Sequence, residues 1–208
     1  MLSRLLSLLL LTMASATHAI EEPRYQVLQS DGAFELRQYE PMLVAHVEVD
    51  GDASGARNAG FRLLAGYIFG GNQGQRKIEM TAPVTQAAAP VGEKIGEKIA
   101  MTAPVTQSAT AAGRWRVSFM MPRAFTLDTL PVPNDERVKF EVLPGEKRAA
   151  VRFDGFSTDS NLGRHRALLE AWVQQQGLKP SGGFVSAFYN DPFTLPWNRR
   201  NEWWVPVE

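Results

Sequence analysis

Few side chains in this sequence could do chemistry. It contains no cysteine and three histidines, of which His46 and His165 lie beyond the first nineteen residues. The lack of cysteine excludes disulfides, zinc–thiolate sites and thiol nucleophiles. The sequence also lacks the Gly-x-Ser-x-Gly motif, the phosphate-binding loop and the HExxH motif. We therefore expect no enzyme activity. The alternative, a hydrolase, would require a catalytic group assembled from scattered residues.

The two histidines stand at unrelated spacing, so they form no metal-binding motif. His165 lies on the apolar face of a predicted helix, where a core-edge histidine with one hydrogen bond is favoured over a metal ligand. His46 shares a strand face with Glu48 and Asp50, which favours exposure to solvent over ligation. We assign no metal ligand and keep His46 as the weak candidate.

The most unusual stretch is a tandem repeat. Residues 77–86 recur at 98–107, at an offset of 98 − 77 = 21 residues, with one position changed. Each copy is rich in Thr, Val and Ile and carries one proline, a composition typical of an edge strand or the rim of a sheet. The segment between the copies, 87–97, is predicted to be a loop. In the alternative interpretation, Met80 or Met101 lines a ligand cavity.

The first nineteen residues have the pattern of a secretory signal peptide. Arg4 supplies the positive charge, Leu5–Met13 the apolar core, and Thr17-His18-Ala19 a cleavage site of small residues. The apolar run is shorter than the roughly 20 residues that a membrane span needs. We expect cleavage after residue 19, a periplasmic or secreted protein, and no stable membrane insertion after cleavage. An uncleaved anchor is the alternative.

The remaining residues, 20–208, are enough for one domain with a hydrophobic core. Apolar residues make up 44% of the chain, as in ordinary globular proteins. The 22 basic and 22 acidic residues give a formal net charge of zero, and no basic block stands out. The charge pattern therefore excludes nucleic acid as the main partner. We expect a monomer.

Hydrophobic periodicity predicts the elements of the first half. Strands are expected over residues 34–37 and 43–49. A helix follows over residues 52–69, with Asp52 or Ser54 as its N-cap and Gly70-Gly71 at its end. Its apolar stripe comprises Ala56, Gly60, Leu63, Leu64 and Tyr67. Arg57, Asn58 and Arg62 fall outside that stripe.

The second half repeats the same order of elements. Strands are expected over residues 115–121, 138–142 and 147–153, a helix over 158–176, and closing strands over 183–189 and 201–207. An apolar loop with prolines, residues 191–199, separates the closing strands. The order predicts an α+β fold of two β-α-β-β units, whose sheets join into a barrel or saddle with one helix on each half.

Several segments together resemble the SOUL / haem-binding protein family. The N-terminal ones are Phe34-Glu35-Leu36-Arg37-Gln38-Tyr39, Gly60-Phe61 and Lys77-Ile78-Glu79-Met80-Thr81-Ala82-Pro83-Val84-Thr85. The later ones are Phe119-Met120-Met121-Pro122, Arg152-Phe153-Asp154-Gly155-Phe156 and Arg199-Arg200-Asn201-Glu202-Trp203. The resemblance runs from about Tyr25 to Val207, and it identifies the chain as a bacterial, secreted member.

The resemblance implies a fold, a ligand and a site. The fold would be a distorted antiparallel β-barrel of duplicated β-α-β-β units, similar to bacterial effector-binding domains. The ligand would be haem or another porphyrin, bound reversibly in a shallow apolar pocket between the first helix and the loop before the last strand. The residues that match this pocket are Arg57, Phe61 and Leu64 from the helix and Phe193, Leu195 and Trp197 from the loop. Arg57 or Arg62 would pair with a propionate.

One position departs from the family pattern. The histidine discussed as haem ligand in some members falls where this chain has Gln38. Haem would therefore bind without a protein ligand, or through His46, or not at all. The expected role is storage, trafficking or scavenging of a tetrapyrrole in the periplasm. An effector-binding barrel for a non-porphyrin ligand and a small-ester hydrolase are the alternatives.

Overall fold

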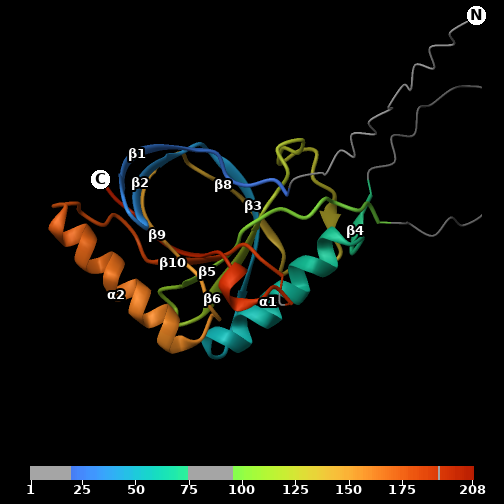
Figure 1. Ribbon diagram of the computed structural model, residues 1–208. Helices are drawn as coiled ribbons and strands as arrows, with labels where there is room; N and C mark the ends of the chain where they lie inside the picture. Colours follow the sequence, from blue (N-terminus) through green and yellow to red (C-terminus); the bar gives the residue numbers. More distant parts are fainter. Residues whose placement is uncertain (1–19, 75–95, 192) are drawn as a thin grey trace, which may run out of the picture.

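A computed structural model describes residues 20–74, 96–191 and 193–208. One large antiparallel sheet curls into a half-barrel, and two helices lie on its outer side (Figure 1). Three predicted segments lie outside the described residues: the signal peptide, the first copy of the repeat and most of the loop over 87–97. No helix among the described residues is both long and apolar enough to cross a bilayer.

The large sheet has nine strands, which pair in one linear order among the described residues. In spatial order they are β1 (Tyr25–Asp31), β2 (Phe34–Tyr39), β9 (Lys147–Phe153), β11 (Asn201–Pro206), β10 (Val185–Phe188), β5 (Val105–Ala109), β6 (Trp115–Met120), β3 (Met42–Val49) and β8 (Lys139–Leu143). The remaining elements are α1 (Ala53–Ile68), α2 (Asp159–Gln175), the short pair β4 (Asn72–Gln73) and β7 (Val132–Pro133), and the 3-10 helix η1 (Pro196–Asn198).

The strand order confirms the predicted duplication. Strands β3, β5 and β6 with α1 form one unit, and β9, β10 and β11 with α2 form the other. The two units join where β5 pairs with β10. Strand β2 precedes the first unit but pairs with β9, whereas β8 precedes the second unit but pairs with β3. Each unit thus completes the sheet of the other.

Helix α1 begins and ends where its residues predict. Asp52 accepts a hydrogen bond from the Gly55 amide at 2.8 Å, and Gly70 follows the helix with φ of 110°. The helix packs against β6 and β3. Gly60 makes this packing close, because a Cβ there would lie 2.6 Å from the Cβ of Val117. The core between α1 and the sheet also buries Leu64 and Tyr67.

Helix α2 covers β9 and β11 in the same way. Thr158 caps it by accepting a hydrogen bond from the Asn161 amide. Its own residues Leu169 and Trp172 are buried in the core between the helix and the sheet. The His165 ring stacks on Phe153 with centroids 4.0 Å apart. Its Nδ1 lies 2.9 Å from the Asn161 carbonyl oxygen. His165 is therefore the hydrogen-bonded core-edge histidine that the sequence predicts.

The second copy of the repeat corrects one prediction. Its residues 105–107 belong to β5, which lies between β10 and β6 in the middle of the sheet rather than at an edge. Pro104 immediately precedes the strand, so the lack of a proline N–H does not interrupt it. Ile99 is buried in the core and the Thr102 hydroxyl donates to the Met120 carbonyl.

Candidate functional site

Arg57 lies where α1, β10 and α2 meet. Its guanidinium carbon is 4.7 Å from the centroid of the Phe188 ring, at the end of β10. Burial lowers the pKa of Arg57, and the negative charge of Asp159 in the first turn of α2 opposes that effect. The side chain is half-buried. A cation held over an aromatic ring beside open solvent can receive a carboxylate.

The other predicted residues of α1 do not share that position. Phe61 is half-buried and packs edge-on against Phe119, with centroids 5.4 Å apart. Leu64 is fully buried in the core and supports the helix from beneath. Arg62 is exposed and lines a separate cleft with Asp135. A hydrogen bond from Arg137 holds the pKa of Asp135 at about 2, so the Asp135 carboxylate in this cleft is ionised and paired with Arg137.

The loop over residues 191–199, here called the flap, presents large apolar side chains to solvent. Phe193 is 93% exposed, Trp197 68% and Leu195 52%. Hydrogen bonds join described residues of the flap to one another and to the connection between β9 and α2. The Phe193 amide donates to the Asp191 carboxylate at 2.8 Å, and the Gly155 amide donates to the Pro196 carbonyl at 2.9 Å. Apolar exposure on such a loop indicates a binding surface.

An open cleft of about 620 Å³ lies beside the flap. It is lined by Ala33, Arg152, Phe153, Asp154, Trp197, Asn198 and Arg199. The Arg199 guanidinium also lies over the Phe156 ring, 4.9 Å from its centroid. The cleft thus combines an exposed indole with two arginines, which suits a flat apolar ligand that carries anionic groups at one edge. Trp197 is the predicted site residue that lines it.

These residues fit a porphyrin ring and its propionates better than they fit the iron. His46 lies on the sheet face away from α1, because its strand neighbours Ala45 and Val47 pack into the core beneath that helix. Its Nδ1 is 4.0 Å from a Glu141 oxygen and has no hydrogen-bond partner among the described residues. His46 therefore cannot reach a ligand held at α1 and the flap. The described residues include no group of three or more potential metal ligands.

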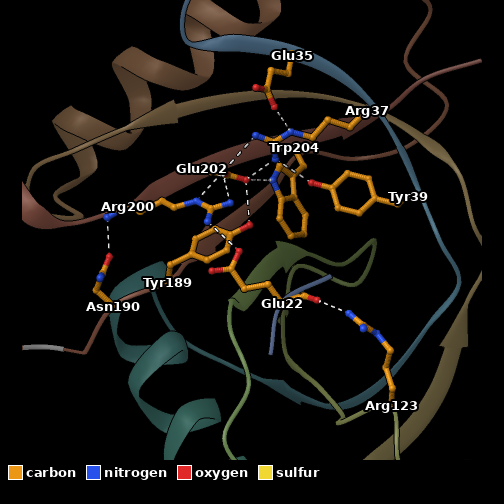
Figure 2. A network of polar contacts seen from close by, with 10 residues as sticks. All are labelled: Glu22, Glu35, Arg37, Tyr39, Arg123, Tyr189, Asn190, Arg200, Glu202 and Trp204. Carbon is orange, nitrogen blue, oxygen red and sulfur yellow. Dashed lines mark hydrogen bonds and ion pairs between the residues drawn. The ribbon is translucent and has the colours of Figure 1, made fainter. Parts of the chain in front are cut away.

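Sequence reasoning missed a buried charge network on the concave face of the sheet. Figure 2 shows side chains converging on Glu202, which has no exposed surface. Its carboxylate accepts hydrogen bonds from Arg37 at 2.7 and 3.3 Å and from Arg200 at 2.9 Å. It also accepts from the Trp204 indole at 2.7 Å and the Tyr189 hydroxyl at 3.1 Å. Arg37 lies on β2 and Trp204 on β11, whereas Tyr189 lies just after β10 and Arg200 just before β11.

The network keeps Glu202 ionised. Burial alone would raise the pKa of Glu202, but the hydrogen bond and charge of Arg37 and the charge of Arg200 hold it below the ordinary value. Arg200 is in turn paired with Glu22 at 2.8 Å. The Arg199-Arg200-Asn201-Glu202 segment was the sequence signal for this network, although its residue types alone do not reveal the partners. With every carboxylate lone pair directed at a donor, the network is built for structure rather than for reaction.

The family model described as SOUL heme-binding protein matches residues 20–206. Heme-binding protein 2 of Homo sapiens is 29% identical over 198 residues, which cover 92% of this chain and 88% of the relative. Heme-binding protein 1 of Mus musculus is 25% identical over 192 residues, which cover 90% and 93% of the two chains.

Two solved structures share the fold at low identity. A hydrolase from Listeria innocua is 12% identical, with a TM-score of 0.57 over 87% of this chain and 94% of that chain. The EcmrR C-terminal domain is 15% identical, with a TM-score of 0.55 over 88% and 98%. At these identities the likeness concerns the fold alone.

Proposed function

The chain belongs to the SOUL heme-binding protein family, and we propose on this premise that it binds haem or a related tetrapyrrole against the flap. The ring would lie on Trp197 and Phe193, over the cleft that Arg152 and Arg199 line. Leu195 would extend the apolar surface. The propionates would reach an arginine of the cleft or Arg57 at the neighbouring junction. The observation that carries the proposal is the exposure of Phe193, at 93%, and of Trp197, at 68%, on a loop whose Pro196 carbonyl accepts a hydrogen bond from the Gly155 amide.

The ring and its edge groups would supply the affinity, and the iron would need no ligand from this chain. An aromatic plate gains from stacking on exposed indole and phenyl rings, and burial of that surface contributes roughly 25 cal/mol per Å². The two propionates gain from charge-assisted hydrogen bonds to guanidinium groups. Since His46 lies on β3, which β11, β10, β5 and β6 separate from β9 in the sheet, a metal-free porphyrin should bind about as well as haem.

We propose that the bound tetrapyrrole is a cargo and that the protein is not an enzyme. Storage, trafficking or scavenging requires a site that exchanges its ligand, and an open surface cleft suits reversible binding. The signal-like residues 1–19 support a periplasmic or secreted location, which would need purification of the exported chain to establish. We propose that the protein acts there as a monomer.

Titration of haem and of protoporphyrin IX into residues 20–208 tests the proposal. We expect a shifted Soret band, quenching of tryptophan fluorescence and saturation at one ligand per chain, with similar affinities for the two ligands. An unshifted Soret band without quenching would exclude haem binding. If binding required iron, the proposal that this chain supplies no ligand to the iron would be wrong.

Arg57 and Arg62 form a matched pair for the propionate contact. Arg57→Ala should weaken binding about tenfold, the effect of losing one charge-assisted hydrogen bond. Arg62→Ala should leave the affinity unchanged, because Arg62 lies beside Asp135 in a different cleft. The same titrations with the dimethyl ester of protoporphyrin IX should abolish the difference between wild type and Arg57→Ala. Equal affinities of wild type and Arg57→Ala for the free acid would remove Arg57 from the site.

A further inference from the structure

A second cavity, distinct from the flap cleft, lies on the concave face of the sheet. Its volume is about 180 Å³, and the two cavities share no lining residue. Its wall is largely apolar and comes from Met42, Val44, Pro104, Met120, Leu143, Val185 and Trp204. Thr106, Ser108 and Ser118 line it as well, from the neighbouring strands β5 and β6. The volume is far too small for a tetrapyrrole but resembles the ~150 Å³ cavity that holds one benzene molecule in an engineered protein.

Arg148 is the buried cation of this cavity. Its residue is 6% exposed, and the guanidinium lies 4.8 Å from the centroid of the Tyr39 ring and 5.3 Å from that of Trp204. The Nε atom donates to a Glu146 oxygen at 2.8 Å. No hydrogen bond joins either terminal Nη atom to another described residue. Four N–H donors of a nearly buried side chain therefore remain available beside the cavity that Arg148 lines.

The other charges around the cavity are more fully paired. Arg116 donates to Glu141 at 3.0 Å and to Glu48 at 3.2 Å. Glu141 thereby has a cationic partner, and Glu146 has the Nε of Arg148. The Nη groups of Arg148 have no acceptor among the described residues, so they can donate hydrogen bonds to a ligand that enters the cavity that Arg148 lines. A planar carboxylate matches the fork of a guanidinium group.

We propose that this cavity binds a small organic carboxylate with a single ring or a short aliphatic chain. The carboxylate would accept hydrogen bonds from the Nη atoms of Arg148. The apolar body would lie along Val44, Met120 and Val185. A cationic ligand is not expected, because the unsatisfied groups of the site are donors. The site is independent of tetrapyrrole binding, since its residues line a different cavity.

Benzoate is a suitable probe, with benzamide and benzylamine as neutral and cationic analogues of the same size. Titration calorimetry on residues 20–208 should show saturable binding of benzoate and at least about tenfold weaker binding of the two analogues. Tryptophan fluorescence should respond to benzoate, because Trp204 lines the cavity. No benzoate binding, or tighter binding of benzylamine, would overturn the proposal.

Two variants of the cavity and one control variant distinguish loss of the binding site from loss of the fold. Arg148→Gln should reduce benzoate affinity about tenfold or more, and Arg152→Gln, which changes an arginine of the flap cleft, should not. Thr106→Leu should block benzoate by filling the cavity without touching the charge, which decides the matter if Arg148→Gln does not fold. Thermal unfolding establishes that each variant is folded. Wild-type affinity for benzoate in Thr106→Leu, or in a folded Arg148→Gln, would refute the site.

Discussion

Glu202 shows how one carboxylate can hold together strands that are far apart in sequence. Its partners come from β2, from β11 and from the ends of the loop between β10 and β11, and Arg37 lies 165 residues before it. A buried ion of this kind is tolerated because several donors surround it, and removal of the charge takes from two arginines the buried carboxylate that they share. Residue types alone could indicate that such a segment matters. They could not indicate that Arg37 completes it, because the pairing depends on the curl of the whole sheet.

Replacement of Glu202 should be strongly destabilising. Glu202→Gln should lower the free energy of unfolding by about 3–5 kcal/mol, because Arg37 and Arg200 lose the buried carboxylate that they share and keep only the partly exposed Glu35 and Glu22 as counter-charges. Glu35→Gln, at a partly exposed partner of the same Arg37, should lower it by at most about 1 kcal/mol. Urea denaturation measures both changes. A loss at Glu202 no larger than that at Glu35 would contradict a structural role for the network.

His46 makes a separate prediction about pH. Burial, aided by the charge of Arg116, lowers the pKa of His46 below its ordinary value of 6.5. Between the lowered pKa and 6.5, the unfolded chain binds more protons than the folded one, so stability falls as pH decreases through this window. Urea denaturation of wild type and His46→Gln across the window should show a steeper loss in the wild type. Parallel profiles would mean that His46 titrates normally in the folded protein.

At the scale of elements, α1 depends on how closely it approaches the sheet. Gly60 and Gly66 both lie within the helix, but only Gly60 faces β6, where a Cβ would meet Val117. Around Gly66 nothing lies within 4 Å of an added Cβ. The same substitution at the two positions thus separates helix propensity from packing.

Gly60→Ala should destabilise the protein and Gly66→Ala should stabilise it. The first forces the helix away from Val117, which costs about 1–3 kcal/mol. The second removes the penalty of glycine in a helix, worth about 1 kcal/mol. Thermal unfolding should show a lower Tm for Gly60→Ala and a higher Tm for Gly66→Ala. Stabilisation by both substitutions would mean that α1 packs less closely than described.

The flap should contribute to ligand binding and little to stability. The double variant Phe193→Ser/Trp197→Ser should weaken haem binding by at least about a hundredfold, since two stacking surfaces are lost. Leu168→Ser, at a similarly exposed leucine on α2, should leave haem affinity unchanged. All three proteins should unfold at similar temperatures. Wild-type affinity in the flap variant would place the tetrapyrrole elsewhere.

Most elements could be predicted from the sequence because apolar residue types recur along one face of each. In β3, β6 and β9 apolar residues stand at every second position, although β6 and β9 are buried on both faces, and both helices carry caps and apolar stripes. Strand β1 could not be predicted, since six of its seven residues are exposed and no alternation marks it. The interior position of β5 was also hidden, because its pairing with β10 joins the two units and leaves no trace in local composition.

The site was only partly predictable for the same physical reason. The resemblance to the family indicated the aromatic residues of the flap and Arg57, because their positions along the chain match those of the family's proposed pocket. Leu64 proved to be a core residue, since the stripe of α1 that buries it also faces the sheet. The arginines of the flap cleft and the cavity around Arg148 could not be predicted, because these residues come together only when two units far apart in the sequence form one curled sheet.

At the scale of the whole molecule, the exchange of β2 and β8 explains why the two units form one curled sheet. Neither unit has a complete sheet without the strand that precedes the other. The curl leaves a cavity on the concave face and a cleft where the flap crosses the connection between β9 and α2. In our proposals, the larger cleft beside the flap would hold the tetrapyrrole and the smaller cavity would hold a carboxylate.

The most direct test of this account is an amide NMR titration of residues 20–208 with protoporphyrin IX, a diamagnetic ring. We predict the largest shift changes in the flap, in the connection between β9 and α2, and near Arg57 at the start of α1. Strands β6 and β8, which line the concave cavity, should change little. Changes centred on those strands, or an absence of saturable changes at the flap, would contradict the proposed tetrapyrrole site.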